Sequence, residues 1–527
     1  MIPARRSALI CPILAAALAF APPSQAQQTG ASAPAQMEAI EKAYAAEDYA
    51  AARAGLLELA TAGDALAQAR LARLLLDGRG GPADPAGAVD WLQKSVQAEN
   101  AQAMVLLGQL YLYGAAGLTA DTKQAVDLLT RAARAGHLSG MVLLGKLYQS
   151  GQGVPVDPAS AARLFQKAAD GGDATAAFEL SKHLSRGSGV ELNTAKALTY
   201  LNAAAEAGHI EAALFLGLAY MTGQGVAQDK AAGIDWLLRA AEGQNPMAQR
   251  LLATSYLQGD GVAQDTAKAL HWMTAAASAG EASAQSNLGY FYATGTGTEQ
   301  DFEQAFHWYK KASDQGLLRA TTALANLYEA GQGVAQDLTR AGDLYLEAAE
   351  QGEPRARARF ARLVGTGRLP APAGPQGRTI IWVADLLLDS DAPSGIAAEE
   401  KAAILSWLQG RADPEGNNHA TAQSRLGLIR VQQGTAAQDT EQLEQGVALI
   451  KTAAARGDAF GQYQLALLYG SGTGVPQDYI AAHAWANLAA ARGMAEAGRS
   501  RDLFAKLMTP EQIAQAQTQA RTYVAEN

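Results

Sequence analysis

The stretch GHIEAALFLGLAYMTGQGVAQDKAAGIDWLLRAAEG, residues 208–243, decides the fold, because the chain repeats its pattern every 36 residues. With the first residue of this stretch as the reference, six consecutive steps give the positions 136, 172, 208, 244, 280, 316 and 352. Further equivalents lie at 63 and 99, and at about 418, 457 and 493. A fixed period overrides the roughly three or four globular domains that the length of the chain would otherwise suggest.

The first half of each unit predicts a helix with one packing face. Ala212, Leu216 and Tyr220 stand four, eight and twelve residues after the reference, and most other copies place residues of the same kinds there. A spacing of four keeps side chains on one face of a helix. Small and large residues alternate along this face, so a neighbouring helix can approach closely.

A loop of the form G-x-G-V-x-x-D follows, as in GQGVAQD at 223–229. Its first glycine predicts a left-handed helix end, and its aspartate predicts the N-cap of a second helix. The second helix carries a large residue, often tryptophan, and ends in an Ala-Ala pair such as Ala240-Ala241. The tryptophans of this column, at 91, 236, 272, 308 and 485, are predicted to pack in the core.

This pattern resembles the Sel1-like repeat, a relative of the tetratricopeptide repeat, over most of residues 63–364 and 457–493. One helical hairpin cannot bury its apolar face alone, so consecutive copies must stack. The resemblance implies an all-α, right-handed superhelical solenoid of antiparallel helix pairs. Such a solenoid is expected to bind a protein or peptide partner and to need no cofactor.

The N-terminal residues predict export. Arg5 and Arg6 precede an apolar run that ends in prolines and Ser24-Gln25-Ala26, which is typical of a signal peptide over 1–26 with cleavage after Ala26. The run is shorter than the roughly twenty residues of a membrane-spanning helix, and no later stretch is apolar enough. We therefore expect a periplasmic or secreted protein without an integral membrane segment.

Removal of residues 1–26 leaves 40 basic and 51 acidic residues, a net charge of −11, and no cysteine. This acidic balance argues against nucleic acid as the partner. The predicted parts of the chain are a flexible linker at 27–36, N-terminal capping helices at 37–62, repeat block 1 at 63–364, a degenerate repeat or spacer at 365–417, repeat block 2 at 418–493, and C-terminal capping helices at 494–527.

The sequence offers no catalytic or metal site. Some cysteine-rich Sel1-like proteins bind penicillin or hydrolyse β-lactams weakly, but the S-x-x-K motif of that chemistry does not occur in this chain. The motifs G-x-S-x-G, H-E-x-x-H, the P-loop and G-x-G-x-x-G are also missing. Equivalent aspartates and histidines of stacked repeats are too far apart to share one metal ion.

The resemblance implies that the first helix of each pair lines the concave surface. The stripe opposite the core columns consists of the positions three, six, ten and thirteen residues after the reference, which we call offsets three, six, ten and thirteen. Residues vary between copies at these offsets, and basic residues outnumber the acidic Glu211 and Glu329. Arg357 and Arg359 are expected to face elsewhere. The residues predicted to bind a partner are Lys146, Lys182, Arg250, Tyr290, Arg319, Asn326, Arg355 and Arg362.

The stripe predicts an acidic partner, either an acidic protein segment or an anionic envelope polysaccharide. The alternative interpretation is that these basic residues are merely solvated. The predicted function is a periplasmic or secreted interaction scaffold or regulator of the cell envelope, and not an enzyme. A penicillin-binding or β-lactamase-like hydrolase is the alternative.

Overall fold

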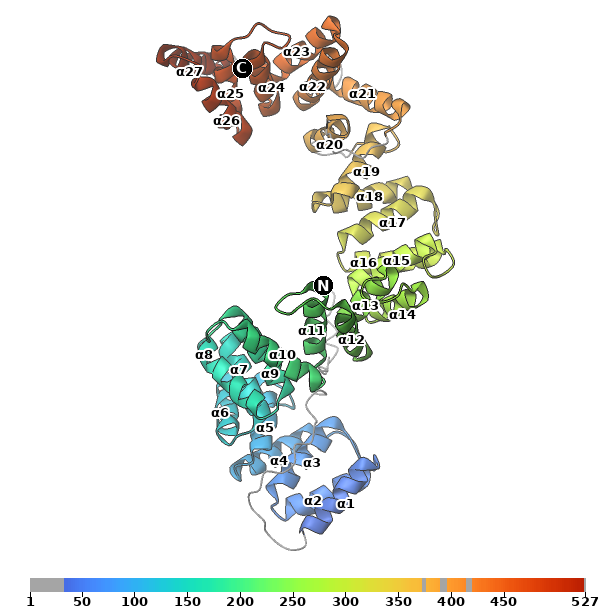
Figure 1. Cartoon of the computed structure of the whole chain (residues 1–527), viewed down its shortest axis with the longest axis vertical. Coiled ribbons are helices and arrows are strands. Elements are labelled where there is room, and N and C mark those ends of the chain that lie inside the picture. The colour runs from blue at the N-terminus through green and yellow to red at the C-terminus, as the bar shows by residue number, and fades with distance from the viewer. Residues whose placement is uncertain (1–32, 372–375, 389–395, 414–418, 526–527) are drawn as a thin grey trace. The chain divides into compact units, whose positions relative to one another are not determined.

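The computed structural model describes residues 33–371, 376–388, 396–413 and 419–525. The predicted signal peptide and most of the predicted linker lie outside these residues. The described part of the chain forms 27 α-helices and no strand (Figure 1). It divides into two compact units, which we call unit 1, residues 1–265, and unit 2, residues 266–527.

Unit 1 contains thirteen helices, of which α3, α5, α7, α9, α11 and α13 are first helices and α4, α6, α8, α10 and α12 are second helices. Their bounds are α1 Ala33–Ala45, α2 Tyr49–Thr61, α3 Ala65–Asp77, α4 Pro85–Gln97, α5 Ala101–Tyr113, α6 Thr122–Arg134, α7 Leu138–Ser150, α8 Pro158–Asp170, α9 Ala174–Arg186, α10 Thr194–Glu206, α11 Ile210–Thr222, α12 Lys230–Glu242 and α13 Pro246–Gln258.

Unit 2 contains the remaining fourteen helices, beginning with the second helix α14. Their bounds are α14 Thr266–Ser278, α15 Ala282–Thr294, α16 Phe302–Asp314, α17 Leu318–Ala330, α18 Leu338–Glu350, α19 Pro354–Gly365, α20 Gln376–Leu388, α21 Ala398–Ala412, α22 Ala420–Ala437, α23 Thr440–Ala455, α24 Ala459–Ser471, α25 Tyr479–Ala491, α26 Ala495–Ala505 and α27 Pro510–Ala525.

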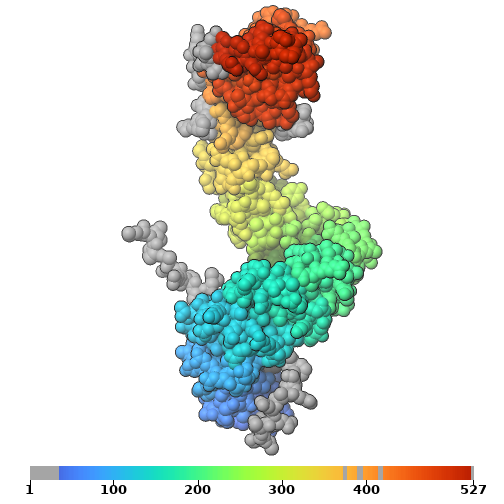
Figure 2. Space-filling view, turned by 90° about the vertical axis from the view of Figure 1, so that its left-hand side faces the viewer, coloured from blue at the N-terminus to red at the C-terminus, as the bar shows by residue number. Residues whose placement is uncertain are grey.

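Most helices pack mainly against the helix before them and the helix after them, whereas α20 also packs against α22 and α27 packs against α25. In unit 1, α12 contacts both α11 and α13, and in unit 2, α18 contacts both α17 and α19. Within each unit the colours of the space-filling view follow one another in chain order, as expected when hairpins contact only their neighbours (Figure 2). The predicted all-α solenoid of antiparallel helix pairs is confirmed.

The loop chemistry agrees with the sequence. Gly223 has a φ of 75° and donates its N–H to the carbonyl of Ala219, which ends α11 in the left-handed conformation. The carboxylate of Asp229 then accepts a hydrogen bond of 3.0 Å from the backbone N–H of Ala232 and caps α12. Both predicted roles are confirmed, and Asp157, Asp301, Asp337 and Asp478 cap their helices in the same way.

The predicted core position of the tryptophans is wrong for four of the five. Trp91, Trp236, Trp272 and Trp308 are half-buried. The next residue of each helix packs in the core instead, and this column contains Leu92, Phe165, Leu237, Met273, Tyr309 and Tyr345. Neighbouring helices lie only about 8–10 Å apart, so a bulky indole fits better at the edge of the interface.

Basic residues three positions later cover several of these exposed indole faces. Lys94 lies 4.1 Å from the centre of the Trp91 ring, and Lys311 lies 4.5 Å from that of Trp308. These are cation–π contacts, which keep the charge in water while the ring is shielded.

First helices also have caps, which the sequence reading did not anticipate. In unit 1 the residue one position after the reference caps each of these helices, and the capping residues are Asp64, Asn100, His137, Asp173, His209 and Asn245. The Nδ1 atoms of His137 and His209 accept hydrogen bonds of 3.4 and 3.2 Å from the backbone N–H groups of Gly140 and Ala212. A histidine can act in this way only while Nδ1 is unprotonated.

These histidine caps predict that unit 1 loses stability in mild acid. Burial lowers the pKa of both histidines below the ordinary 6.5, against the opposing effect of acidic neighbours such as Asp173. Well above pH 6.5 both the folded and the unfolded chain are neutral at these positions. As the pH falls below 6.5 the unfolded chain takes up protons first, so the free energy of unfolding decreases.

The measurement is thermal unfolding of the wild type and of H137N/H209N at pH 7.5 and 5.5. Asparagine is the cap that this chain uses at positions 100 and 245 and does not titrate. We expect the melting temperature to fall less between pH 7.5 and pH 5.5 for the variant than for the wild type. An equal loss in both proteins would show that these caps do not carry the pH dependence.

Candidate partner-binding surface

The predicted partner-binding residues lie on first helices of both units. Unit 1 contains Lys146 on α7, Lys182 on α9 and Arg250 on α13. The five in unit 2 are Tyr290 on α15, Arg319 and Asn326 on α17, and Arg355 and Arg362 on α19. We therefore treat each unit by itself.

The predicted stripe is wrong at offset six. This column is mostly buried, as shown by Val142, Phe178, Leu214, Ser286 and Thr322. A first helix packs between two second helices, so its buried arc is wider than the single row of core columns. Arg250 occupies this column and is half-buried, whereas the residues at offsets three and ten are half-buried or exposed.

The lysines of unit 1 differ from each other. Lys182 places its Nζ 2.7 Å from a carboxylate oxygen of Glu179 and 5.0 Å from the centre of the Phe178 ring. Its charge is thus largely matched within α9. Lys146 is exposed.

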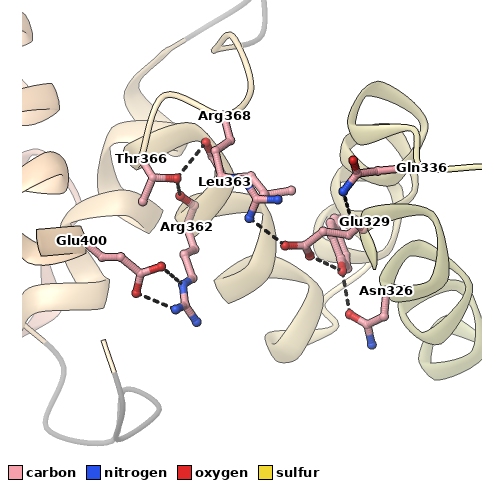
Figure 3. A network of polar contacts seen from close by, with 9 residues as sticks. Asn326, Glu329, Gln336, Arg362, Leu363, Thr366, Arg368 and Glu400 are labelled. Atoms are coloured by element: carbon pink, nitrogen blue, oxygen red, sulfur yellow. Dashed lines mark hydrogen bonds and ion pairs between the residues drawn. The ribbon is translucent and has the colours of Figure 1, made fainter. Parts of the chain in front are cut away.

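Asn326 of unit 2 takes part in a network of polar contacts (Figure 3). The buried hydroxyl of Tyr345 on α18 lies 2.5 Å from Oδ1 of Asn326 and 2.9 Å from Oε2 of Glu329, and both oxygens act as acceptors. Burial and the neighbouring carboxylate raise the pKa of Tyr345 well above 10. Arg368 donates to the other oxygen of Glu329 at 3.0 Å, so the charge of this carboxylate is already paired.

Arg362 is paired as well, with a residue of the predicted spacer (Figure 3). Its Nε and Nη2 donate to the two carboxylate oxygens of Glu400 on α21, at 2.9 and 2.5 Å. This two-bond geometry is the strong form of an Arg–carboxylate pair. The hydrogen bonds from Arg362 lower the pKa of Glu400 below its ordinary value.

Arg359 shares the exposed face of α19 with Arg355 and Arg362, so the expectation that it faces elsewhere is wrong. The three residues are four and three positions apart within one continuous helix, a spacing that puts them on one side. Arg359 is close enough to Tyr345 for its positive charge to oppose part of the rise in the pKa of that phenol. We call Arg355, Arg359 and Arg362 the α19 arginine stripe.

The charge of this part of unit 2 is divided between first and second helices. The first helices α17 and α19 together carry five arginines and one glutamate. The second helix between them, α18, carries one arginine and three acidic residues. Arg319, Arg355 and Arg359 are exposed, and no ion pair involving them occurs among the described residues. Positive charge is therefore concentrated on the first-helix surface.

In the described ranges, no group of three or more His, Cys, Asp or Glu side chains is placed so that it could hold a metal ion. A shallow hollow of about 660 Å³ between two loops is lined by Tyr292, Glu299 and Asp301, among others. Asp301 is engaged there as a cap, accepting hydrogen bonds from the backbone of α16. Among the described helices, none is long and apolar enough to cross a membrane.

Comparison with known proteins agrees with the repeat pattern. The family model described as the Sel1 repeat matches nine segments, at residues 65–100, 101–137, 138–173, 174–209, 210–245, 246–281, 282–317, 318–353 and 459–494. No curated protein matches the chain significantly.

Two solved structures are similar over most of their length. A protective antigen present in uropathogenic Escherichia coli strains, which displays an SLR fold, is 27% identical with a TM-score of 0.55, over 90% of this chain and 94% of that chain. A Sel1 repeat protein from Oxalobacter formigenes is 28% identical with a TM-score of 0.44, over 65% of this chain and 97% of that chain. Since the Sel1 repeat matches span more than half of its length, the chain belongs to the Sel1 repeat family.

Proposed function

We propose that this protein is a non-catalytic interaction scaffold of the cell envelope that binds an anionic partner, either an acidic protein or an anionic polysaccharide, on the first-helix surface of α17 and α19. The observation that carries the proposal is the surplus of exposed arginine on these two helices. The chain as a whole is acidic, with a net charge of −9, so such a local surplus is unusual for it. A rigid frame of repeats with a variable exposed face suits partner binding.

The acidic residues around the surface support this assignment. Glu329 is paired with Arg368, Glu400 with Arg362 and Glu350 with Arg378. Arg319, Arg355 and Arg359 thus keep their charge available for a ligand. Exposed charges of one sign attract a partner of the opposite sign and increase the rate of association.

The location in the envelope rests on the N-terminal sequence. We propose that residues 1–26 are a signal peptide and that the mature protein works in the periplasm or outside the cell. The similar structure from uropathogenic Escherichia coli is that of a protective antigen, which is compatible with export. We do not favour the penicillin-binding alternative, because the sequence has no S-x-x-K motif.

The binding proposal predicts that R355Q/R359Q weakens binding of an anionic probe about tenfold, because two charge-assisted contacts are lost. The probes are a fluorescent glutamate-rich peptide and a fluorescent oligomer of a polyuronic acid, followed by fluorescence anisotropy. Binding to the wild type should also weaken as salt is raised from 50 to 300 mM, and less so for the variant, because salt screens exposed charges.

The matched control is R340Q/R357Q. Arg340 is exposed on the second helix α18, and Arg357 lies on α19 two residues from Arg355 and Arg359, which puts it on the other side of the helix. This variant removes the same charge from the same region but leaves the stripe intact. Equal losses in both variants would show that net charge alone governs binding, and the assignment of the surface would be wrong.

A further inference from the structure

The α19 arginine stripe already holds one carboxylate, and this carboxylate belongs to the chain itself. Glu400 lies in the first turn of α21 and binds Arg362 through two hydrogen bonds. The side chains of Arg362 and Glu400 are 37% and 29% exposed, so water reaches the pair. Because the pair is open to water, another carboxylate can reach Arg362, and the pair can exchange while both helices stay folded.

The contact shows what kind of group the stripe accepts. Arg362 binds a carboxylate that projects from an α-helix and approaches α19 from outside the regular repeats. Arg355 and Arg359 are exposed on the same face of α19 and have no such occupant among the described residues. Along a helix, residues four and seven positions apart are separated by about 6 and 10.5 Å. Carboxylates at the same spacing on a second helix would face all three arginines.

We propose that the partner is an acidic polypeptide helix whose carboxylates bind Arg355 and Arg359 and displace Glu400 from Arg362. Glu400 is then an internal competitor, which occupies one third of the stripe until the partner arrives. The inference rests on the proposed function, since it names the partner of the same surface. When the partner displaces Glu400, Arg362 exchanges one carboxylate for another and is not left unpaired. The free-energy cost of displacement is therefore lower than the cost of leaving an arginine without a partner in a buried site.

The test measures the affinity of the full-length chain for three fluorescent probes. The first is a helical alanine-based peptide with glutamates at positions i, i+4 and i+7, the second has the same composition in scrambled order, and the third is the polyuronic acid oligomer. In E400Q the competitor loses its charge while its shape is kept. We expect E400Q to bind the first peptide about three to ten times more tightly than the wild type does.

The control variant is E399Q. Glu399 is exposed beside Glu400 in the same helical turn, so its loss changes the local charge equally without freeing Arg362. E399Q should bind within about twofold of the wild type, because a nearby exposed charge acts only weakly through water. The double variant R362Q/E400Q should not show the increased affinity of E400Q for the first peptide, because it lacks the arginine that E400Q frees. Circular dichroism of each variant checks that the chain as a whole remains folded.

Three results would overturn the inference. If E400Q and E399Q bind equally, Glu400 is no competitor. If R362Q/E400Q keeps the gain, the effect does not act through Arg362. If E400Q increases the affinity for the scrambled peptide or the polyuronic acid as much as it increases the affinity for the ordered peptide, the stripe does not select a helix. Each of these differs from a failure of the proposed function, in which the wild type binds none of the probes.

Discussion

Replacing Phe165 with alanine is expected to destabilise unit 1 by about 3 to 5 kcal/mol, the usual cost of removing a large core side chain. Phe165 lies on α8 and is fully buried. Gly145 of α7 lies directly against it, so close that a Cβ atom there would be 2.7 Å from the phenyl ring. The backbone of α7 thus packs on the ring itself, and alanine would leave a cavity that the helices cannot close.

The control is F215A in the same unit. Phe215 is 51% exposed on α11 and touches the Phe178 ring at a centroid distance of 5.7 Å. Its loss should cost less than about 1 kcal/mol, because little surface is buried there. Urea denaturation followed by far-ultraviolet circular dichroism gives both values. A loss at Phe165 no larger than that at Phe215 would mean that the α7–α8 interface is packed differently from the structure.

Replacing Gly333 with alanine is expected to destabilise unit 2 by about 2 to 4 kcal/mol. Gly333 is the second glycine of the G-x-G loop and has a φ of 66°, a conformation that costs other residues about 1 to 2 kcal/mol. A Cβ atom there would also lie 2.1 Å from the carbonyl oxygen of Phe302, at the start of the second helix of the preceding repeat. This backbone contact leaves no side chain to move aside.

Gly352 separates the two contributions. It has a φ of 96°, but a Cβ atom at this position would meet nothing within 4 Å. G352A should therefore cost only the conformational part, about 1 to 2 kcal/mol. The difference between the two variants in urea denaturation measures the contact between successive repeats. If G333A and G352A are equally stable, the loop does not pack against the preceding helix as described.

The repeat pattern predicted the helices well because each column has a local physical role. Glycine at position 223 and aspartate at position 229 set the end of one helix and the start of the next, wherever the unit stands in the array. Roles that depend on neighbouring repeats were harder to predict. Gly333, the second glycine of its loop, is needed because of the helix that begins 31 residues earlier, at Phe302.

The candidate site was predicted only in part. Arg359 lies outside the offsets of the predicted stripe, although helical spacing alone puts it beside Arg355 and Arg362. Offset six was misjudged because a residue such as Phe178 contacts neighbouring helices that lie outside its own hairpin. The pair between Arg362 and Glu400 had no signal in the sequence, since Glu400 lies where the repeat pattern breaks.

Hydrogen–deuterium exchange of the full-length chain, with and without a saturating concentration of the ordered glutamate peptide, tests the proposed binding surface most directly. Because a bound ligand suppresses local opening, exchange slows in the elements that it contacts. We predict slower exchange in α17 and α19, together with unchanged exchange in α3–α13 of unit 1. Protection confined to unit 1, or spread evenly over both units, would contradict the assignment of the partner to the arginines of α17 and α19.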